Sequence, residues 1–276
     1  MRVFVLKKKV LVRVLVFVLL LTGAAVYTKV AIGGDTQTFS SSGEGTTVCS
    51  VDTDKKEICL TFDTAFGEDQ TEAILQVLKD KGVCATFAVM GAWGQENDEL
   101  LRAIREEGHD IISHSMTHER YNEMEADAIA RDAQAARSFL KLEAGTDTPF
   151  IRPPYGACSE EVYAALRKEG LIPVRWSIDS KDWKGEGAEA ITKQVVSNCK
   201  PGAIVLFQNN VKDTPEALAA VIDQLKELGY SFTPLSEMAM QENYIVDING
   251  IQRARETEDS LRSPDAKDAQ ITKEGE

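Results

Sequence analysis

The sequence predicts an α/β fold, an irregular barrel of (β/α)7 type with about seven strand and helix units. Between residues 57 and 238, short apolar runs alternate with longer amphipathic ones, which is typical of parallel strands joined by crossover helices. An open doubly wound sheet would give the same alternation. The choice rests on polar residues that directly follow predicted strands, namely Asp63, His114, Arg152, Asp179 and Gln208. Each follows a different strand, and a closed barrel gathers its strand ends at one mouth, so we expect a barrel.

The individual elements follow from the length and the period of the apolar pattern. Short continuous apolar runs predict strands over 58–62, 85–89, 110–112, 150–151, 172–176, 203–207 and 231–233. Longer stretches with apolar residues at helical spacing predict helices over 70–81, 96–107, 125–142, 160–169, 188–198 and 215–228. Taken in chain order, each helix lies between two strands, as parallel pairing requires.

The first 32 residues are predicted to be a signal peptide or a single-span membrane anchor. Basic residues at positions 2, 7–9 and 13 precede an apolar run from Val14 to Ile32 that is interrupted by Lys29. A basic segment followed by an apolar one is typical of exported proteins. Gly23-Ala-Ala25 offers a cleavage site, whereas the length of the run is close to that of a membrane span. We expect an exported protein that is anchored in the cell membrane facing outward or, after cleavage, secreted.

The remaining sequence divides into three parts. Residues 33–56 are rich in Gly and Ser without periodicity, which predicts a flexible linker. Residues 57–238 form the globular domain. Residues 239–276 are rich in charged residues and poor in large apolar ones, which predicts a disordered tail.

Composition restricts the partners and the redox chemistry. The net charge is −13, and no basic patch lies outside the first residues, so a nucleic-acid partner is not expected. The chain has five cysteines, an odd number without a CxxC pair, which argues against a disulfide framework and a cysteine metal site. Cys59 and Cys84 lie in apolar runs and are predicted to be small buried hydrophobic residues.

Two of the three histidines, His114 and His118, are four residues apart. At that spacing two imidazoles can share one helix face and bind one divalent ion. Asp63 could supply a further ligand or a general base. The third histidine, His109, precedes a predicted strand, and we expect it to make a structural hydrogen bond.

The chain resembles the polysaccharide deacetylases with a NodB homology domain, carbohydrate esterase family four, over residues 57–238. Five motifs carry the resemblance, in the family's order. They are Thr61-Phe-Asp63, His114-Ser-Met-Thr-His118, Arg152-Pro-Pro-Tyr-Gly156, Asp179-Ser-Lys-Asp-Trp183 and Leu206-Phe-Gln208.

The resemblance implies a role for each motif residue. Asp63 would be the general base, and Arg152 would fix it by a charge-assisted hydrogen bond. His114 and His118 would bind a divalent metal, zinc, with cobalt or nickel as alternatives.

The remaining motif residues would bind the substrate and complete the site. The backbone N–H of Tyr155 would stabilise the oxyanion together with the metal, and Pro154 and Trp183 would contact the substrate. Asp179 would normally orient the catalytic histidine of the last motif.

Two positions depart from the family pattern. Thr64 replaces the second aspartate, so a metal would need Asp63, Glu68 or Asp69 as a further ligand. This feature resembles a sporulation-associated branch, in which a small residue and an aromatic-Gly pair follow, as in Ala65-Phe-Gly67.

Gln208 replaces the histidine that acts as the general acid. Loss of a general acid typically costs about a hundred- to ten-thousandfold in rate, because an amide cannot release a proton near neutral pH. Catalysis would then require Asp63 to return its proton to the leaving amine.

The expected function is metal-dependent removal of N-acetyl groups from cell-wall amino sugars, with peptidoglycan favoured over chitin as the glycan partner. The alternative is a catalytically impaired protein that binds glycan during cell-wall or spore-envelope assembly. Hydrolysis of a non-sugar amide on the same fold remains a further option.

Overall fold

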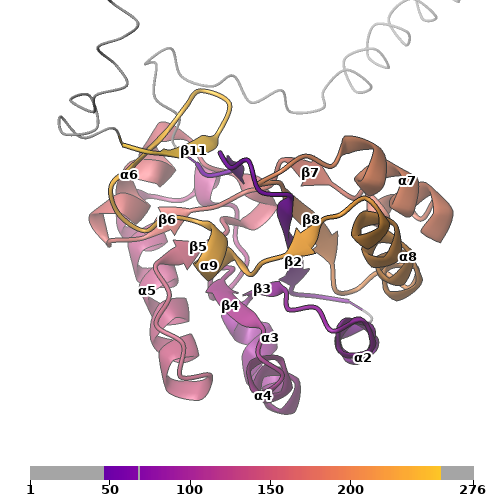
Figure 1. Ribbon diagram of the computed structural model, residues 1–276. Helices are drawn as coiled ribbons and strands as arrows, with labels where there is room; N and C mark the ends of the chain where they lie inside the picture. Colours follow the sequence, from indigo (N-terminus) through magenta and orange to yellow (C-terminus); the bar gives the residue numbers. More distant parts are fainter. Residues whose placement is uncertain (1–46, 68, 256–276) are drawn as a thin grey trace, which may run out of the picture. The chain divides into compact units, whose positions relative to one another are not determined.

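The protein is described by a computed structural model, which covers residues 47–67 and 69–255 (Figure 1). An eight-stranded parallel sheet has the order β6-β5-β4-β3-β2-β8-β7, and β9 pairs with the start of β2. Its strands are β2 (Glu57–Thr64), β3 (Thr86–Val89), β4 (Asp110–Ser113), β5 (Phe150–Ile151), β6 (Ile172–Pro173), β7 (Ile178–Asp179), β8 (Ile204–Gln208) and β9 (Ser231–Phe232). The helices are α2 (Thr71–Lys81), α3 (Gly91–Glu96), α4 (Asp98–Glu106), α5 (Ala126–Glu143), α6 (Glu160–Lys168), α7 (Ala188–Asn198), α8 (Thr214–Glu227) and α9 (Leu235–Met238).

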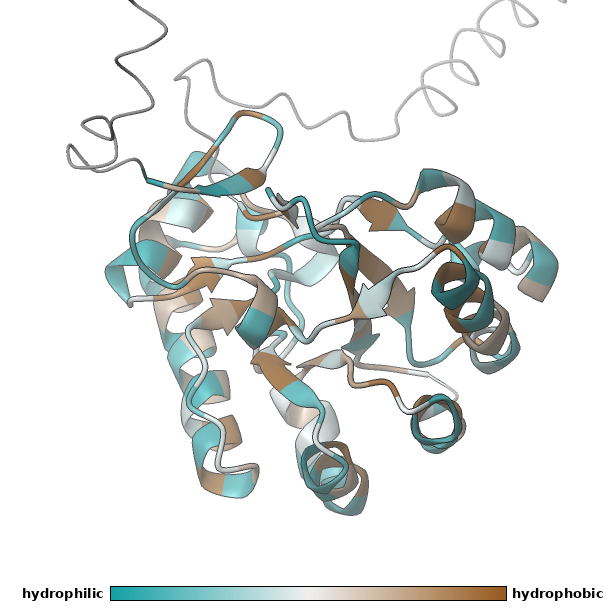
Figure 2. Cartoon of the chain, in the orientation of Figure 1, coloured by the Kyte–Doolittle hydropathy of each residue, from teal (hydrophilic) through white to brown (hydrophobic). Residues whose placement is uncertain are grey.

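The predicted alternation of strands and helices is confirmed, and most boundaries agree within a few residues. The predicted helix 96–107 corresponds to α4, and the short helix α3 before it was not predicted. Asn97 separates the two helices, because its φ of −130° and ψ of 50° lie outside the helical region. Figure 2 shows hydrophobic residues concentrated on the strands and mixed hydropathy along the helices, as expected for helices with one face on a sheet.

The expectation of a closed barrel was wrong: the sheet is a parallel half-barrel. β6 and β7 are its two edges, and no pairing joins them within residues 47–255 as described. The predicted strand 172–176 ends at Pro173, and the chain then crosses from one edge to the other without a helix. On the way Val174 bridges Val48, and Ser177 N–H donates to the Ile204 carbonyl. The backbone of this crossing segment forms hydrogen bonds with Val48 and Ile204, so β6 and β7 do not pair with each other.

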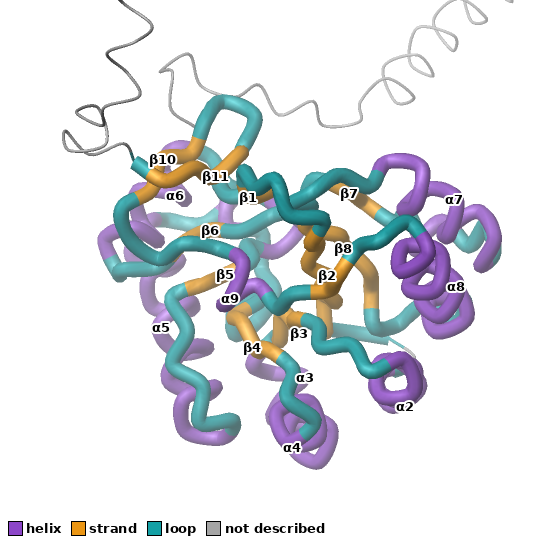
Figure 3. The backbone as a smooth tube through the Cα atoms, viewed as in Figure 1, coloured by secondary structure: helices purple, strands orange, loops and turns teal. Residues whose placement is uncertain are grey.

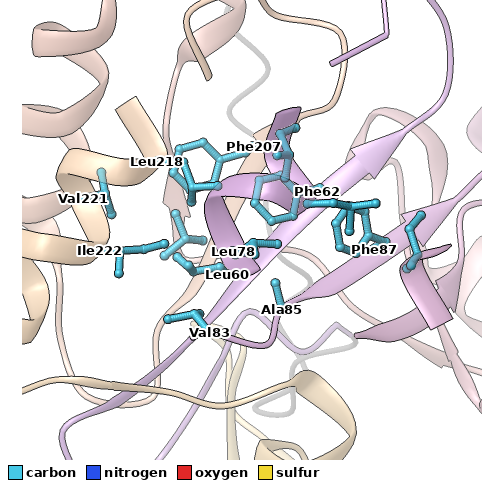
Figure 4. Close-up of a cluster of buried hydrophobic side chains, with 14 of the residues drawn as sticks. Leu60, Phe62, Leu78, Val83, Ala85, Phe87, Phe207, Leu218, Val221 and Ile222 are labelled. Carbon is cyan, nitrogen blue, oxygen red and sulfur yellow. The ribbon is translucent and has the colours of Figure 1, made fainter. Parts of the chain in front are cut away.

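Successive side chains of β2 point alternately into the hydrophobic core and towards the opposite side of the sheet. Leu60 and Phe62 point to the side covered by helices, where they pack with Leu78 of α2 and Leu218 of α8 (Figure 4). The Phe62 ring stacks on Phe87 and Phe207 of the neighbouring strands, with centroids 5.0 and 5.6 Å away. Because successive side chains of a strand face opposite ways, the residue after Phe62 points away from this core.

The structure differs from the expected linker and tail at their inner ends. β1 (Ser50–Val51), β10 (Tyr244–Val246) and β11 (Ile251–Ala254) form a separate three-stranded sheet (Figure 3). Gln252 is fully buried in it and exchanges two 2.8 Å hydrogen bonds with the Met240 backbone. Strands of two to four residues leave too short a pattern to be detected in sequence.

The leader, the beginning of the linker and the end of the tail lie outside the described residues. Within the part that is described, no helix is long and apolar enough to cross a membrane. All five cysteines are free thiols. Cys59 is buried as predicted, whereas the prediction for Cys84 was wrong because its side chain is exposed.

Candidate active site

Asp63 and Arg152 form a buried ion pair at the carboxyl end of the sheet. Asp63 lies on β2 between Ala88 of β3 and Gln208 of β8, and it is 6% exposed. Arg152, which directly follows β5, is fully buried and donates from Nη1 to Asp63 Oδ1 over 2.7 Å. Its Nη2 donates to the Arg175 carbonyl over 3.0 Å. The predicted contact between Arg152 and Asp63 is therefore present, and it orients the carboxylate.

His114 and His118 converge as expected, but on a loop and not on a helix. Ser115 and His118 have φ values of 66° and 62°, in the left-handed region, and His118 N–H donates to Ser115 Oγ over 2.7 Å. This turn brings the two Nε2 atoms within 3.1 Å of each other. The helix-face interpretation was wrong because β4 ends at Ser113 and its last carbonyls are used by other strands.

The imidazole of His114 has one defined tautomer. Its Nδ1 lies 2.8 Å from the Arg152 carbonyl oxygen, which only accepts, so Nδ1 carries the proton and Nε2 a lone pair. That Nε2 lies 3.6 Å from Asp63 Oδ2. Burial lowers the pKa of His114, and burial together with His114 lowers the pKa of His118 to about 4. Both rings are therefore neutral near pH 7, the form that binds metals.

Asp132 of α5 holds the histidine loop, and sequence analysis did not identify it. Its carboxylate accepts hydrogen bonds from the Met116 N–H at 2.9 Å, from Thr117 Oγ1 at 2.8 Å and from the Tyr121 hydroxyl at 2.8 Å. The available signal was a carboxylate among alanines in the middle of an amphipathic helix.

Aromatic side chains surround His118 at the surface. Tyr155, with φ 59°, is 52% exposed and lies edge-on to His118 with ring centroids 4.8 Å apart. Phe66, which was not predicted as a site residue, is 55% exposed and lies 5.2 Å from the same ring. The Arg120 guanidinium lies 3.9 Å above the Tyr155 ring. Pro154 is buried in the turn.

In the fourth motif, Asp182 contacts Gln208, whereas Asp179 was predicted to orient the residue at that position. Asp182 is fully buried and accepts hydrogen bonds from Gln208 N–H and Thr214 Oγ1, both at 2.8 Å. Burial raises the pKa of Asp182. Asp179 accepts from Lys181 N–H at 2.8 Å and from Trp183 Nε1 at 3.5 Å, which leaves the Trp183 ring 59% exposed.

Comparisons with known proteins agree with this arrangement. A family model described as polysaccharide deacetylase matches residues 50–174. The peptidoglycan-N-acetylmuramic acid deacetylase PdaA of Bacillus subtilis is 31% identical over 193 residues, which are 68% of this chain and 73% of that protein. The chain belongs to the polysaccharide deacetylase family. The parallel half-barrel is the fold of this family.

Further relatives within the family include enzymes and pseudoenzymes. The peptidoglycan-N-acetylglucosamine deacetylase PgdA of Listeria monocytogenes is 33% identical over 66% of this chain, which spans only 39% of that enzyme. A crystal structure of a peptidoglycan N-acetylglucosamine deacetylase has 31% identity and a TM-score of 0.67, covering 70% of this chain and 92% of that one. A mutant of a family pseudoenzyme with restored activity has 29% identity and a TM-score of 0.66, covering 70% and 71%.

Two residues of this site, His114 and His118, are placed to bind one metal ion. Two nitrogen ligands on a tetrahedral zinc lie roughly 3.3 Å apart, and the Nε2 atoms of His114 and His118 lie 3.1 Å apart. Within the described residues, no group of three or more His, Cys, Asp or Glu side chains is arranged to hold an ion. The family is typically metal-dependent, and this chain offers two imidazoles for that purpose.

The alternative third ligands considered from the sequence do not complete the set. Thr64 is fully buried, and its hydroxyl donates to the Phe62 carbonyl over 3.3 Å. Asp69 accepts 2.7 Å hydrogen bonds from Thr71 N–H and Trp93 Nε1, so its carboxylate is already occupied. Glu68 lies outside the described residues.

Proposed function

We propose that this protein is an extracytoplasmic polysaccharide deacetylase that hydrolyses N-acetyl groups of amino sugars in peptidoglycan. The observation that carries the proposal is the buried contact of Asp63 with Arg152 beside the two converging imidazoles. The Listeria and Bacillus subtilis relatives are described as peptidoglycan deacetylases, which supports a cell-wall substrate.

The chain's own residues would divide the reaction as follows. A divalent metal held by His114 and His118 would lower the pKa of water towards about 7 and polarise the acetamide carbonyl. Asp63, oriented by its hydrogen bond with Arg152, would take the proton of the attacking water. The Tyr155 backbone N–H would stabilise the oxyanion, and the Trp183 ring would form a wall of the pocket for the acetyl group. Since Gln208 cannot release a proton, Asp63 would return the proton to the leaving amine.

The second candidate is a glycan-binding pseudoenzyme of the sporulation-associated branch. Two replacements favour it, because Thr64 removes a metal ligand and Gln208 removes the general acid. The relatives described as pseudoenzymes support such a loss of turnover within the family. In either case residues 1–32 would export the chain, as an outward-facing membrane anchor or a cleaved signal.

Acetate release separates the two candidates. The native protein, Gln208→His and the control Gln224→His on the exposed face of α8 would be assayed on peptidoglycan and on acetylated glucosamine oligomers with zinc. For a weakened deacetylase, we expect Gln208→His to raise turnover about a hundred- to ten-thousandfold and the control to leave it unchanged. If neither the native protein nor Gln208→His releases acetate while both bind glycan, the enzymatic proposal is lost and the pseudoenzyme remains.

A further inference from the structure

Arg120 and Tyr155 form a cationic platform at the edge of the site. We infer that this platform binds the carboxylate of an acidic amino sugar, one with a lactyl ether beside the acetamido group, in preference to a neutral N-acetylglucosamine unit. The inference rests on the proposed function, because it names the sugar that the same site would take. It goes further by assigning specificity to a residue outside all five motifs.

The position of the guanidinium follows from two ring contacts and one backbone angle. The Arg120 guanidinium carbon lies 3.9 Å from the centre of the Tyr155 ring, and that ring lies edge-on to His118. The left-handed φ of 59° at Tyr155 turns the residue out of the buried motif, so its ring is 52% exposed. The Tyr155 ring therefore lies between the Arg120 guanidinium and His118, one of the two imidazoles beside which the acetamide would react.

The backbone on the other side of Arg120 is also anchored. The Arg120 carbonyl accepts a 2.9 Å hydrogen bond from Glu123 N–H, which closes a short 3-10 turn. The next residue, Tyr121, is fully buried with its hydroxyl on Asp132. Stacking and an anchored backbone reduce the entropy that the side chain loses when it binds a ligand.

The charge of Arg120 has no acidic partner among the described residues. The ion pairs of that part of the chain include Arg102 with Asp98 at 2.7 Å and Arg137 with Asp147 at 2.9 Å, but none with Arg120. A guanidinium that stacks by its face keeps the N–H groups of its edge free, and those groups match the two oxygens of a carboxylate.

The chemistry of the substrate agrees with a cation close to the histidines. In an amino sugar with a lactyl ether, the carboxylate belongs to a lactyl group whose ether oxygen is on the carbon next to the acetamido carbon. An acetamide at the histidines would therefore have this carboxylate nearby, and the Tyr155 ring contacts both His118 and Arg120. A neutral amino sugar places only a hydroxyl there, and a hydroxyl forms a weaker hydrogen bond with a cation than a carboxylate does.

Calorimetric titration tests the assignment without requiring turnover. The ligands are the disaccharide of N-acetylglucosamine and N-acetylmuramic acid and the same disaccharide with its carboxylate converted to a methyl ester. We expect the native protein to bind the acid about tenfold more tightly than the ester at low salt, and the ratio to fall as salt rises. Arg120→Gln is expected to bind both forms equally, whereas Arg120→Lys retains part of the preference.

Arg102→Gln is the matched control, since it removes the same charge from the surface of α4 and should keep the native ratio. Thermal unfolding of Arg120→Gln is expected to match that of the native protein, because the side chain is exposed. Equal affinity of the native protein for acid and ester, absence of binding, or an unchanged ratio in Arg120→Gln would overturn the inference. If the acid is preferred but no acetate is released from it, the proposed enzymatic function fails and the carboxylate subsite stands.

Discussion

The Nη1 atom of Arg152 lies 2.7 Å from Oδ1 of Asp63, although the two residues are 89 positions apart in the sequence. Both side chains are almost completely excluded from water, at 0% and 6% exposure. Burying a carboxylate without a partner is costly, so Arg152 compensates the charge of the expected base and fixes its orientation.

Replacing Arg152 should destabilise the protein far more than replacing a surface arginine. Arg152→Met leaves Asp63 buried without a partner, and we expect the free energy of unfolding to fall by about 3–5 kcal/mol. Arg102→Met, which breaks an exposed pair, should cost less than about 1 kcal/mol. Urea unfolding measures both, and similar small losses for the two variants would contradict a buried ion pair.

Zinc should stabilise the native fold through the histidine pair. A ligand present at about a hundredfold over its dissociation constant adds about 2.7 kcal/mol to the stability of the state that binds it. We expect added zinc to raise the melting temperature of the chelator-treated native protein, but not that of His114→Ala or His118→Ala. His109→Asn serves as the control and should retain the shift. A shift that survives in His114→Ala would place the metal elsewhere.

Asp132 should affect the site without contacting a substrate. Asp132→Ala removes the acceptor for three donors of the histidine loop, and we expect a loss of about 1–3 kcal/mol in stability. Zinc affinity should fall about ten- to a hundredfold, because the loop that orients the imidazoles is released. Glu143→Ala, an exposed position at the end of the same helix, is expected to change neither quantity. Unaltered zinc affinity in Asp132→Ala would show that the loop holds its shape without the carboxylate.

His109 should contribute to acid destabilisation. Its Nδ1 accepts a 3.3 Å hydrogen bond from Ala85 N–H, and burial lowers its pKa below the ordinary 6.5. The unfolded chain therefore takes up a proton near pH 6.5, while the folded chain takes it up only at lower pH. The contribution of His109 to the free energy of unfolding is therefore fully present above pH 6.5 and is lost as the pH falls below that value.

The test compares stability against pH in the native protein and in His109→Asn, whose side-chain oxygen can accept the same hydrogen bond. The free energy of unfolding of the variant should decrease less steeply below pH 6.5. Parallel curves would show that His109 does not titrate differently on folding.

Much of the fold and part of the site could be predicted before any coordinates. The strand over 58–62 and the helix over 70–81 follow from local period and length, and the structure has β2 and α2 there. The placement of Asp63, His114 and Arg152 at strand ends follows from the same period. The structural hydrogen bond of His109 was also predicted. The short helix α3 and the strands β1, β7, β10 and β11 were not, because patterns so short carry no period.

The sequence by itself determined which segments form strands and helices, which polar residues end the strands, and which family they belong to, because these depend on neighbours within a few positions. Only the tertiary structure decided that the sheet stays open, that His114 and His118 meet on a loop, that Asp182 and not Asp179 holds the Gln208 backbone, and that Arg120 stacks on Tyr155. Each of these depends on long-range contacts, whose geometry is set by how the elements pack and not by the residues adjacent in the chain.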